Sequence, residues 1–304
     1  MTSFNLPTTM KPVPVPSHPG DVLVKVHATS PCKGEFDWFL LNDSLYTGIP
    51  GQDLAGTVVL APEDSGFKPG DEIYARIEAS RPGAAAEYVL ARVSELAIRP
   101  KNLSWAETAA CPISALTAYQ SLFTKGLLHP KALAGDEAAR KKNSMVRLLI
   151  NGAAGAVGSW TVQMARLAGV ETIAAVVGTQ SIDFIRQLGA TEIIDYKKQI
   201  IREWVAEDPE SRQFDLVLDC IGKPDVAQTW YAVRDGGILI AISFDPEESR
   251  LGDDLDVITK LLEAGKLKPN IDSVVGLDDF EEAWDKVESG RAKGKVVVKI
   301  IDEE

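Results

Sequence analysis

The sequence predicts an α/β protein in which a mostly antiparallel β domain precedes a doubly wound parallel sheet. Short apolar stretches separated by Gly and Pro turns fill the first third of the chain, a pattern typical of antiparallel strands. From about residue 145, apolar stretches alternate with amphipathic helical patterns, which indicates parallel strands joined by helices. A glycine-rich turn separates the first of these strands from its helix. A chain of 304 residues has room for about two domains.

The antiparallel part begins after a proline-rich stretch that ends near residue 20. Its predicted strands comprise residues 21–28, 51–60, 71–77 and 86–93. Ser104 and Glu107 match a helix capping box, so we expect a helix over residues 104–122. Pro112 should kink or divide that helix, because proline has no N–H to donate within it.

The parallel part repeats a strand followed by a helix. Its strands are almost entirely apolar, which predicts a sheet covered on both faces. The predicted strands are residues 145–150, 172–177, 192–195, 214–220 and 238–242, and the helices between them are residues 155–167, 181–188, 199–206 and 225–233. Two more helices, residues 257–264 and 280–288, and a last strand, residues 295–301, complete the chain.

Composition excludes several classes of function. Hydrophobic residues make up 45% and charged residues 25%, as in ordinary globular proteins. The net charge of −12 argues against nucleic acid or an anionic membrane as partner. No apolar run reaches the ~18 residues of a membrane span, and residues 1–16 do not resemble a signal peptide. Cys32, Cys111 and Cys220 lie far apart, which suits a reducing compartment, so we expect a cytoplasmic protein.

The glycine turn has the spacing G-x-x-G-x-x-G and leads directly into a helix. Gly152 allows the turn, Gly155 lets the backbone approach a pyrophosphate, and Gly158 lets the helix pack on the strand. Tight packing alone would also explain such glycines. The strand–helix units that follow favour a dinucleotide, because helix N–H groups at this place can bind phosphate. The residues predicted to do so are Gly152, Ala154, Gly155, Ala156, Val157 and Gly158.

Several sequence blocks carry a resemblance to a known family. They comprise residues 19–26, 50–58, 67–72, 115–120, 152–158, 188–190, 194–197 and 288–297. Over nearly its whole length the chain resembles the medium-chain dehydrogenase/reductase superfamily. The branch it resembles contains the zinc-free quinone oxidoreductases and the accessory enoyl reductases of fungal pathways. The resemblance implies a GroES-like substrate domain, residues 1–115 completed by 266–304, interrupted by a Rossmann dinucleotide-binding domain, residues 116–265.

The chain departs from the zinc-dependent members of this superfamily. Those members have Gly-His-Glu where this chain has Gly51-Gln52-Asp53, and Gln is a poor zinc ligand. Cys32 and Asp53 alone do not make a site, and no cysteine cluster could hold a structural zinc. We therefore predict that the protein binds no metal.

Two structural segments that the family usually has are also missing. A β-hairpin normally precedes the proline-rich stretch. A sixth sheet strand normally follows residues 238–242, but residues 243–256 are acidic, contain Pro246 and have no β-branched run. In relatives that strand commonly forms the dimer contact. We therefore expect a five-stranded Rossmann sheet and a monomer, or a dimer built differently.

The second strand of the Rossmann pattern indicates the cofactor. An NAD site would have Asp or Glu at its end to accept from the ribose 2′-OH, but the chain has Thr179 and Ser181 there. Tyr196 and Lys197 match family positions that face the adenosine phosphate. Asp183, the nearest acid, lies within the next helix. These residues favour NADP.

Other cofactor contacts are implied by position or by the resemblance. Relatives contact the cofactor at the positions of Thr117 and of the pair Asp37-Trp38. Thr117 is equally well explained as a helix threonine bonded to a backbone carbonyl, and Trp38 as a core residue. The fourth and fifth strands end in Ile221-Gly222 and Ser243-Phe244, at the edge where doubly wound sheets bind ligands. Gly222 and Ser243 are also ordinary turn residues.

Hydride transfer to an activated C=C bond puts negative charge on a carbonyl oxygen, and the α-carbon then needs a proton. Tyr46 occupies roughly the place of a substrate-side tyrosine in some relatives, and Lys295 lies in the C-terminal matching block. Tyr46 and Lys295 are the catalytic candidates. The simpler alternatives are that Tyr46 is an ordinary loop aromatic and that Lys295 is an ordinary lysine at a strand edge. We predict an NADPH-dependent reductase of an enone, quinone or enoyl thioester. The alternatives are a zinc-free alcohol or aldehyde oxidoreductase and a catalytically silent NADPH-binding protein.

Overall fold

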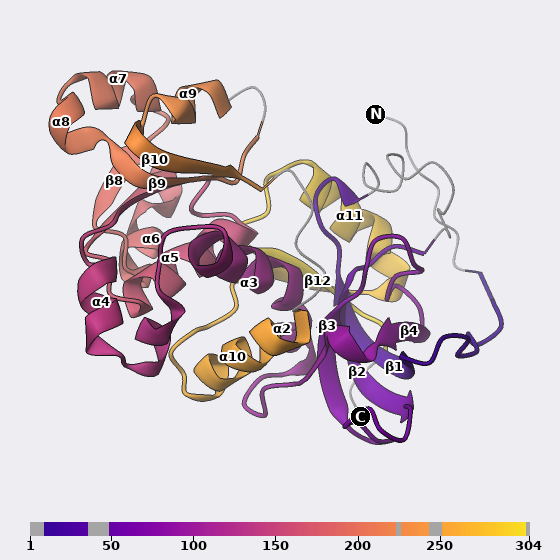
Figure 1. Ribbon diagram of the computed structural model, residues 1–304. Coiled ribbons are helices and arrows are strands. Elements are labelled where there is room, and N and C mark those ends of the chain that lie inside the picture. Colours follow the sequence, from indigo (N-terminus) through magenta and orange to yellow (C-terminus); the bar gives the residue numbers. More distant parts are fainter. Residues whose placement is uncertain (1–8, 36–48, 223–225, 243–250, 302–304) are drawn as a thin grey trace. The chain divides into compact units, whose positions relative to one another are not determined.

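The computed structural model describes residues 9–35, 49–222, 226–242 and 251–301 (Figure 1). Its contacts divide the chain into two compact units. The first unit comprises Met1–Ile113 with Glu247–Glu304, and the second comprises Ser114–Pro246. Within the described ranges, no helix combines the length and the apolar character that crossing a membrane requires.

The first unit contains a seven-stranded sheet with the strand order β11-β12-β1-β2-β3-β5, and β4 also pairs with β1. Its strands are β1 (Asp21–Ser30), β2 (Asp53–Leu60), β3 (Glu72–Arg76), β4 (Tyr88–Arg92), β5 (Leu96–Ile98), β11 (Ile271–Gly276) and β12 (Lys295–Lys299). All neighbours are antiparallel except β11 and β12. The last strand, β12, therefore pairs with the first strand, β1. This pairing agrees with our expectation that residues 266–304 complete the first domain.

Short helices cover this sheet. Helix α2 (Trp105–Ala109) begins at the predicted cap, where Ser104 accepts a hydrogen bond from the Glu107 N–H. The predicted helix over residues 104–122 is divided at Pro112 into α2 and α3 (Pro112–Tyr119), because proline cannot continue the hydrogen-bond ladder. Helix α3 continues into the π-helical segment η2 (Gln120–Thr124), and the chain from Ser114 on belongs to the second unit. Helix α11 (Phe280–Glu288) packs Phe280, Ala283 and Trp284 on Val296 and Val298 of β12. The turns η1 (Val93–Glu95) and η6 (Leu277–Asp279) complete the unit.

The second boundary between the units differs from our expectation. We expected residues 116–265 to form one domain, but α10 (Leu251–Glu263) packs on β3 and β5 of the first unit. Tyr74 Oη donates a 2.8 Å hydrogen bond to the carbonyl of Leu255. The buried face of α10 includes Leu251, Leu255, Ile258 and Leu262. Helical periodicity reveals that this apolar face exists, but it does not say which sheet covers it.

The second unit contains a parallel sheet with the strand order β10-β9-β6-β7-β8. The strands are β6 (Arg147–Asn151), β7 (Thr172–Val177), β8 (Glu192–Asp195), β9 (Phe214–Asp219) and β10 (Val233–Ala241). On the central strand, Leu149 pairs with Ala174 on one side and with Val217 on the other. The described residues thus form the five-stranded, doubly wound sheet that the sequence predicts. Residues 243–250, which follow β10, lie outside the described ranges.

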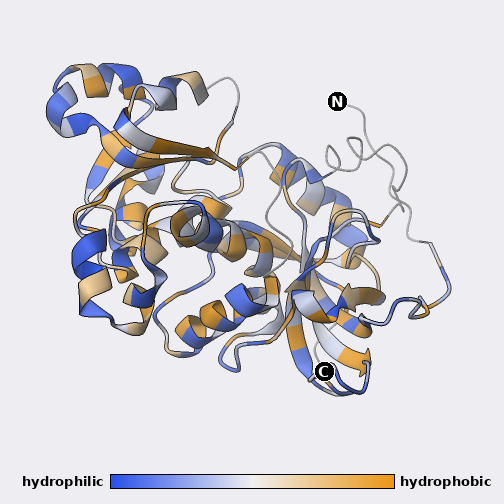
Figure 2. Cartoon of the chain, viewed as in Figure 1, coloured by the Kyte–Doolittle hydropathy of each residue, from blue (hydrophilic) through white to orange (hydrophobic). Residues whose placement is uncertain are grey.

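Helices connect these strands in the predicted alternation. They are α5 (Ala156–Leu167), α6 (Ile182–Leu188), α7 (Ile201–Ala206) and α9 (Val226–Trp230), with the turn η4 (Thr179–Ser181). The short helix α8 (Pro209–Arg212), and the turn η3 (Pro130–Ala134) and helix α4 (Glu137–Asn143) that precede β6, were not predicted. Figure 2 shows hydrophobic residues along the strands and mainly hydrophilic ones on α4 and α8. Leu148, Leu149, Ile150 and Phe214 are fully buried. Burial of this apolar surface holds the strand ends at one edge of the sheet.

Candidate cofactor site and buried charge cluster

Three glycines shape the turn between β6 and α5. Gly152 has φ +80°, a conformation that favours glycine, and a Cβ there would lie 2.7 Å from Ile221 Cδ1. A Cβ at Gly158 would lie 2.4 Å from the carbonyl oxygen of Gly152, and one at Gly155 would lie 3.3 Å from the same oxygen. The three glycines therefore let helix, turn and neighbouring strand approach more closely than side chains allow.

The first turn of α5 offers donors to an anion. The helix has 12 residues, and Gly155 precedes it with extended backbone and no side-chain cap. Ser159 N–H donates to the carbonyl of Gly155, so the helix leaves the N–H groups of Ala156, Val157 and Gly158 without intrahelical acceptors. These groups lie at the positive end of the helix dipole. The geometry of the turn suits a diphosphate at the carboxyl edge of the sheet, and binding there stays a prediction.

The ends of β7 and β8 lie side by side at the same edge of the sheet. Tyr196 Oη lies 2.9 Å from where a Cβ of Gly178 would be, and Lys197 Nζ lies 5.0 Å from the Tyr196 ring centroid. Thr179 is exposed and Ser181 is half-buried. The structure therefore brings the four predicted residues Thr179, Ser181, Tyr196 and Lys197 to adjoining loops.

Asp195 is a residue at this place that sequence reasoning missed. Its Oδ2 accepts a 2.7 Å hydrogen bond from the hydroxyl of Thr179, and its Oδ1 accepts one of 3.0 Å from the Lys197 N–H. The Thr179 hydroxyl, helped by the Lys197 N–H and the Lys198 ammonium, holds the pKa of Asp195 below its ordinary value. Because Asp195 ends the third strand of the Rossmann pattern and not the second, a search for an acid at the end of β7 does not find it.

The ends of β6 and β9 are joined by a second pair that the sequence did not reveal. Asn151 and Asp219 are register partners, and Asn151 Nδ2 donates a 3.0 Å hydrogen bond to Asp219 Oδ1. The same oxygen accepts from the N–H groups of Ile221 and Gly222 at 2.9 and 3.3 Å. Gly222 has φ +82°. The carboxylate of Asp219 therefore fixes the predicted Ile221-Gly222 turn against the phosphate turn at Gly152.

The remaining predicted site residues, which include the catalytic candidate Tyr46, are not tested. Thr117 is half-buried on α3. Asp37, Trp38, Tyr46, Ser243 and Phe244 lie outside the described residues. Their assignments stay predictions.

Lys295 belongs to a buried charge cluster in the first unit, which comprises Cys32, Glu35, Asp53, Arg76 and Lys295. Lys295 Nζ lies 2.7 Å from Asp53 Oδ2, and the two side chains are 4% and 0% exposed. Asp53 Oδ1 accepts a 2.7 Å hydrogen bond from the Ile113 N–H. Glu35 accepts from the N–H groups of Cys32 and Gly51 at 3.0 and 2.5 Å. The ammonium of Lys295 is therefore held by a carboxylate inside the unit.

Burial controls the protonation of this cluster. It raises the pKa of Glu35 to about 7, although two backbone N–H groups and Lys295 oppose the shift. It also raises the pKa of the Cys32 thiol to about 11. Burial alone would lower the pKa of Lys295, but Asp53 and the other acidic groups reverse this and raise it. Lys295 is therefore a fixed cation, whereas Glu35 titrates near neutral pH.

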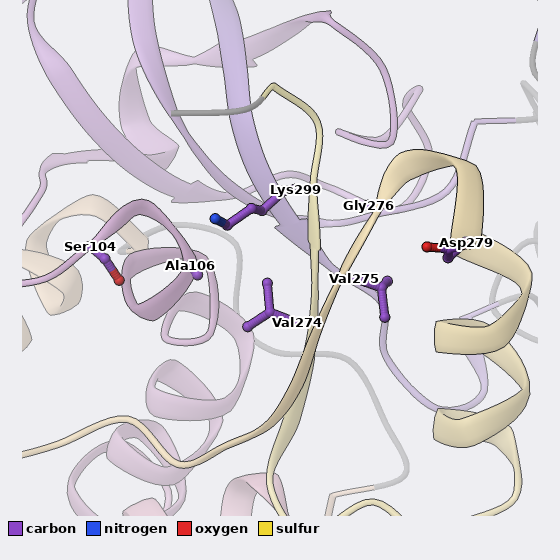
Figure 3. A pocket seen from close by; sticks show the side chains of 7 residues that line it. All are labelled: Ser104, Ala106, Val274, Val275, Gly276, Asp279 and Lys299. Carbon is purple, nitrogen blue, oxygen red and sulfur yellow. The ribbon is translucent and has the colours of Figure 1, made fainter. Parts of the chain in front are cut away.

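One hollow in the described surface lies elsewhere in the first unit. It has a volume of about 570 Å³ and lies beside the edge strand β11 (Figure 3). Figure 3 shows Val274 and Val275 between Lys299 on one side and Asp279 on the other. The hydroxyl of Ser104, which also lines it, is engaged in the capping box with Glu107. None of the predicted site residues lines this hollow, so we do not assign the active site to it.

Comparison with known proteins identifies the family. Residues 18–101 match the alcohol dehydrogenase GroES-like domain, and residues 156–289 match the zinc-binding dehydrogenase domain. A "probable zinc-binding oxidoreductase, mitochondrial" of Arthroderma benhamiae is 41% identical over 99% of this chain and 94% of its own length. The chain belongs to the medium-chain dehydrogenase/reductase superfamily. It is therefore an oxidoreductase of this class and uses a nicotinamide cofactor.

Other superfamily members support the same assignment. A chloroplastic quinone oxidoreductase, QR1, of Triphysaria versicolor is 33% identical over 94% of this chain and 92% of its own length. A 2-methylene-furan-3-one reductase of Solanum lycopersicum is 32% identical over 91% of this chain and 71% of its own length. The solved quinone oxidoreductase of Coxiella burnetii superposes with a TM-score of 0.79 at 23% identity, covering 95% of this chain and 93% of that one. The structural likeness shows the shared fold.

Zinc appears in the name of the matching domain and of one relative, but the described residues of this superfamily member do not suit it. No group of three or more His, Cys, Asp or Glu side chains among them could hold a metal ion. Asp53 already holds an ammonium group at 2.7 Å. Gln52 supplies a neutral amide that is 1% exposed, and neither amide atom has a hydrogen-bond partner within the described ranges. Zinc prefers thiolate, imidazole and carboxylate ligands, so this donor set does not fit it.

Proposed function

We propose that the protein is an NADPH-dependent reductase of activated C=C bonds, acting on an enone, a quinone or an enoyl thioester without a metal. One observation carries the cofactor part of this proposal. The turn at Gly152, Gly155 and Gly158 directs backbone N–H groups of α5 to the carboxyl edge of a parallel sheet. The substrate class is supported by the relatives, whose printed names include a quinone oxidoreductase and a 2-methylene-furan-3-one reductase.

The preference for NADP rests on the loops after β7 and β8. The residues directly after β7, from Gly178 to Ser181, include no acid that would bind a ribose 2′-OH directly. Lys197 and the hydroxyl of Ser181 can donate hydrogen bonds to a 2′-phosphate. Tyr196, which lies against Gly178 and is 53% exposed, offers a flat surface for the adenosine end.

The residues of this chain have separate tasks in the reaction. The α5 N–H groups hold the diphosphate, and the Asp219 carboxylate fixes the turn at Ile221 and Gly222 beside it. NADPH, when bound, supplies the hydride, which adds to the β-carbon of the substrate. Tyr46 donates a hydrogen bond to the carbonyl oxygen as negative charge develops there, and a proton then adds to the α-carbon. Lys295, with its charge fixed by Asp53, is the second candidate for stabilising that charge.

The proposed absence of a metal follows from the donor set. A neutral Gln52 and a lysine-paired Asp53 give a cation little to bind. Elemental analysis of the purified protein tests this directly. We expect less than about a tenth of a zinc ion per chain and no change in activity after chelation. One tightly held zinc per chain would contradict the proposal.

The experiment that tests the function is a reductase panel. Absorbance of NADPH and NADH is followed with small enones, quinones and enoyl thioesters, and with aldehydes as controls. We expect oxidation of NADPH with at least one conjugated substrate. Tight NADPH binding without oxidation would instead favour a silent nucleotide-binding protein. Turnover confined to aldehydes would indicate an alcohol or aldehyde oxidoreductase.

Assembly and location are further parts of the proposal. Without a sixth Rossmann strand in the described residues, we propose a monomer or a dimer that does not use that strand. Light scattering after size exclusion measures this. We propose a cytoplasmic location because all three cysteines are free thiols in the structure. The Arthroderma relative is named as mitochondrial, so cell fractionation must separate the two compartments.

A further inference from the structure

The loops after β7 and β8 contain a hydrogen bond whose direction is fixed. The Asp195 side chain is 8% exposed, and its Oδ2 lies 2.7 Å from Thr179 Oγ1. An ionised carboxylate has no hydrogen to donate, so Thr179 must be the donor. Asp195 is also tied to the Lys197 N–H at 3.0 Å and lies 3.8 Å from Lys198 Nζ. The carboxylate is therefore ionised and held in one place by three groups.

This fixed bond decides what Thr179 can offer to a ligand. A hydroxyl has one hydrogen and two lone pairs. The hydrogen of Thr179 points to Asp195, so only lone pairs remain for anything that binds beside it. Thr179 is exposed and follows Gly158 by about 20 residues, the distance at which Rossmann folds contact the adenosine ribose.

The two nicotinamide cofactors respond differently to such an acceptor. The ribose of NADH carries a 2′-OH that can donate to Thr179. The 2′-phosphate of NADPH is largely a dianion above its second pKa of roughly 6 and then has only acceptors. A lone pair of Thr179 backed by the Asp195 carboxylate repels it. Asp195 also attracts the ammonium group of Lys198, whose side chain is 73% exposed.

We propose that Asp195 is a positioning residue that limits the preference for NADPH over NADH by holding Thr179 as an acceptor at the adenosine ribose. This inference rests on the proposed function, because it requires a nicotinamide dinucleotide on this edge of the sheet. It assigns to the Asp195–Thr179 pair the task that a single acid at the end of the second strand performs in NAD sites. The protein therefore binds both cofactors, with NADPH bound more tightly through Lys197 and Ser181.

The decisive variant is Asp195→Asn, which keeps size and shape. The Lys197 N–H needs an acceptor, so the new amide oxygen takes the place of Oδ1 and the NH₂ group faces Thr179. The NH₂ group donates to Thr179, whose own hydrogen is then free to point at a phosphate. We expect the ratio of the NADH to the NADPH dissociation constant, measured by fluorescence titration at pH 8, to rise about tenfold. Thermal melts check that the variant is folded.

The matched control is Asp183→Asn. Asp183 is an exposed acid in the first turn of α6. Its substitution removes the same charge from the same unit without changing the contact to Thr179. We expect it to change the ratio by less than about twofold, because exposed charges are screened by salt. An equal effect of both variants would overturn the proposal in favour of general electrostatics.

A second variant tests whether Thr179 transmits the effect. In a Thr179→Val background, Asp195→Asn should change the ratio by less than about threefold, since no hydroxyl remains to reverse. A tenfold change in that background, or no change for Asp195→Asn alone, overturns the role of the pair. Failure of the proposed function is measured on the unmodified protein, which would then bind neither NADPH nor NADH, or would bind NADPH without oxidising it on any conjugated substrate.

Discussion

The ion pair between Lys295 and Asp53 allows a quantitative test of how the first unit is held together. Their side chains are 4% and 0% exposed, so water screens the attraction little. Lys295→Met keeps most of the side-chain volume but removes the charge. Breaking a buried pair from one side costs about 3–5 kcal/mol, because the other charge stays buried and uncompensated. We therefore expect Lys295→Met to lose roughly that much of the free energy of unfolding.

The assay is urea denaturation at pH 8, followed by far-UV circular dichroism. Burial already raises the pKa of Asp53 in the wild type, and loss of the opposing Lys295 ammonium raises it further, so Asp53 in the folded variant gains stability by taking up a proton. The variant's deficit should therefore shrink as the pH falls towards the unfolded pKa of Asp, about 4. The double variant Lys295→Met with Asp53→Asn removes both charges of this ion pair and keeps an acceptor for the Ile113 N–H. We expect it to recover at least half of the loss.

The reasoning would be refuted by two results. One is a loss below about 1 kcal/mol for Lys295→Met at pH 8, a value typical of exposed pairs. The other is a double variant no more stable than the single one, which would mean that packing and not charge is responsible. Lys295→Arg is the charge-preserving control and should lie between the wild type and Lys295→Met.

Four further predictions concern other parts of the site. The pKa of Glu35 is raised from 4.5 to about 7, so between these pH values the folded state binds a proton that the unfolded state has lost. The free energy of unfolding of the wild type should therefore fall by about 3 kcal/mol from pH 4.5 to 7. Glu35→Gln should remove this pH dependence from denaturation curves. Asn151→Asp places two carboxylates together and should weaken NADPH binding at least tenfold at pH 8. Adding Asp219→Asn restores the donor–acceptor pair. Equal NADPH affinities of the wild type and Asn151→Asp in titration would count against the pair. Gly158→Ala should lower cofactor affinity and cost about 1–3 kcal/mol of stability, because the new Cβ would lie 2.4 Å from a backbone oxygen. Unchanged melting and unchanged cofactor binding would show that α5 can shift to accommodate it. Tyr46→Phe should reduce kcat at least about 100-fold with the NADPH dissociation constant unchanged, and unaltered turnover would remove Tyr46 from the mechanism.

Much of the fold follows from local sequence patterns. The turn at Gly152, the helix cap at Ser104 and the division at Pro112 were each predictable, because a few neighbouring residues determine them through φ angles and hydrogen-bonding capacity. The five strands of the second unit were predictable for a related reason. Strands buried on both faces consist of apolar residues almost throughout, and turns separate them.

The charge relations of the site were decided by the tertiary structure. Lys295 pairs with Asp53, Asp195 with Thr179, and Asp219 with Asn151, although other residues separate the partners in the chain. Sequence marked Lys295 and Thr179 as candidates but did not reveal what each one contacts. A local pattern specifies which side of an element is buried. The partner that it meets there depends on which strands become neighbours, and that is settled only when the whole chain packs its apolar faces together.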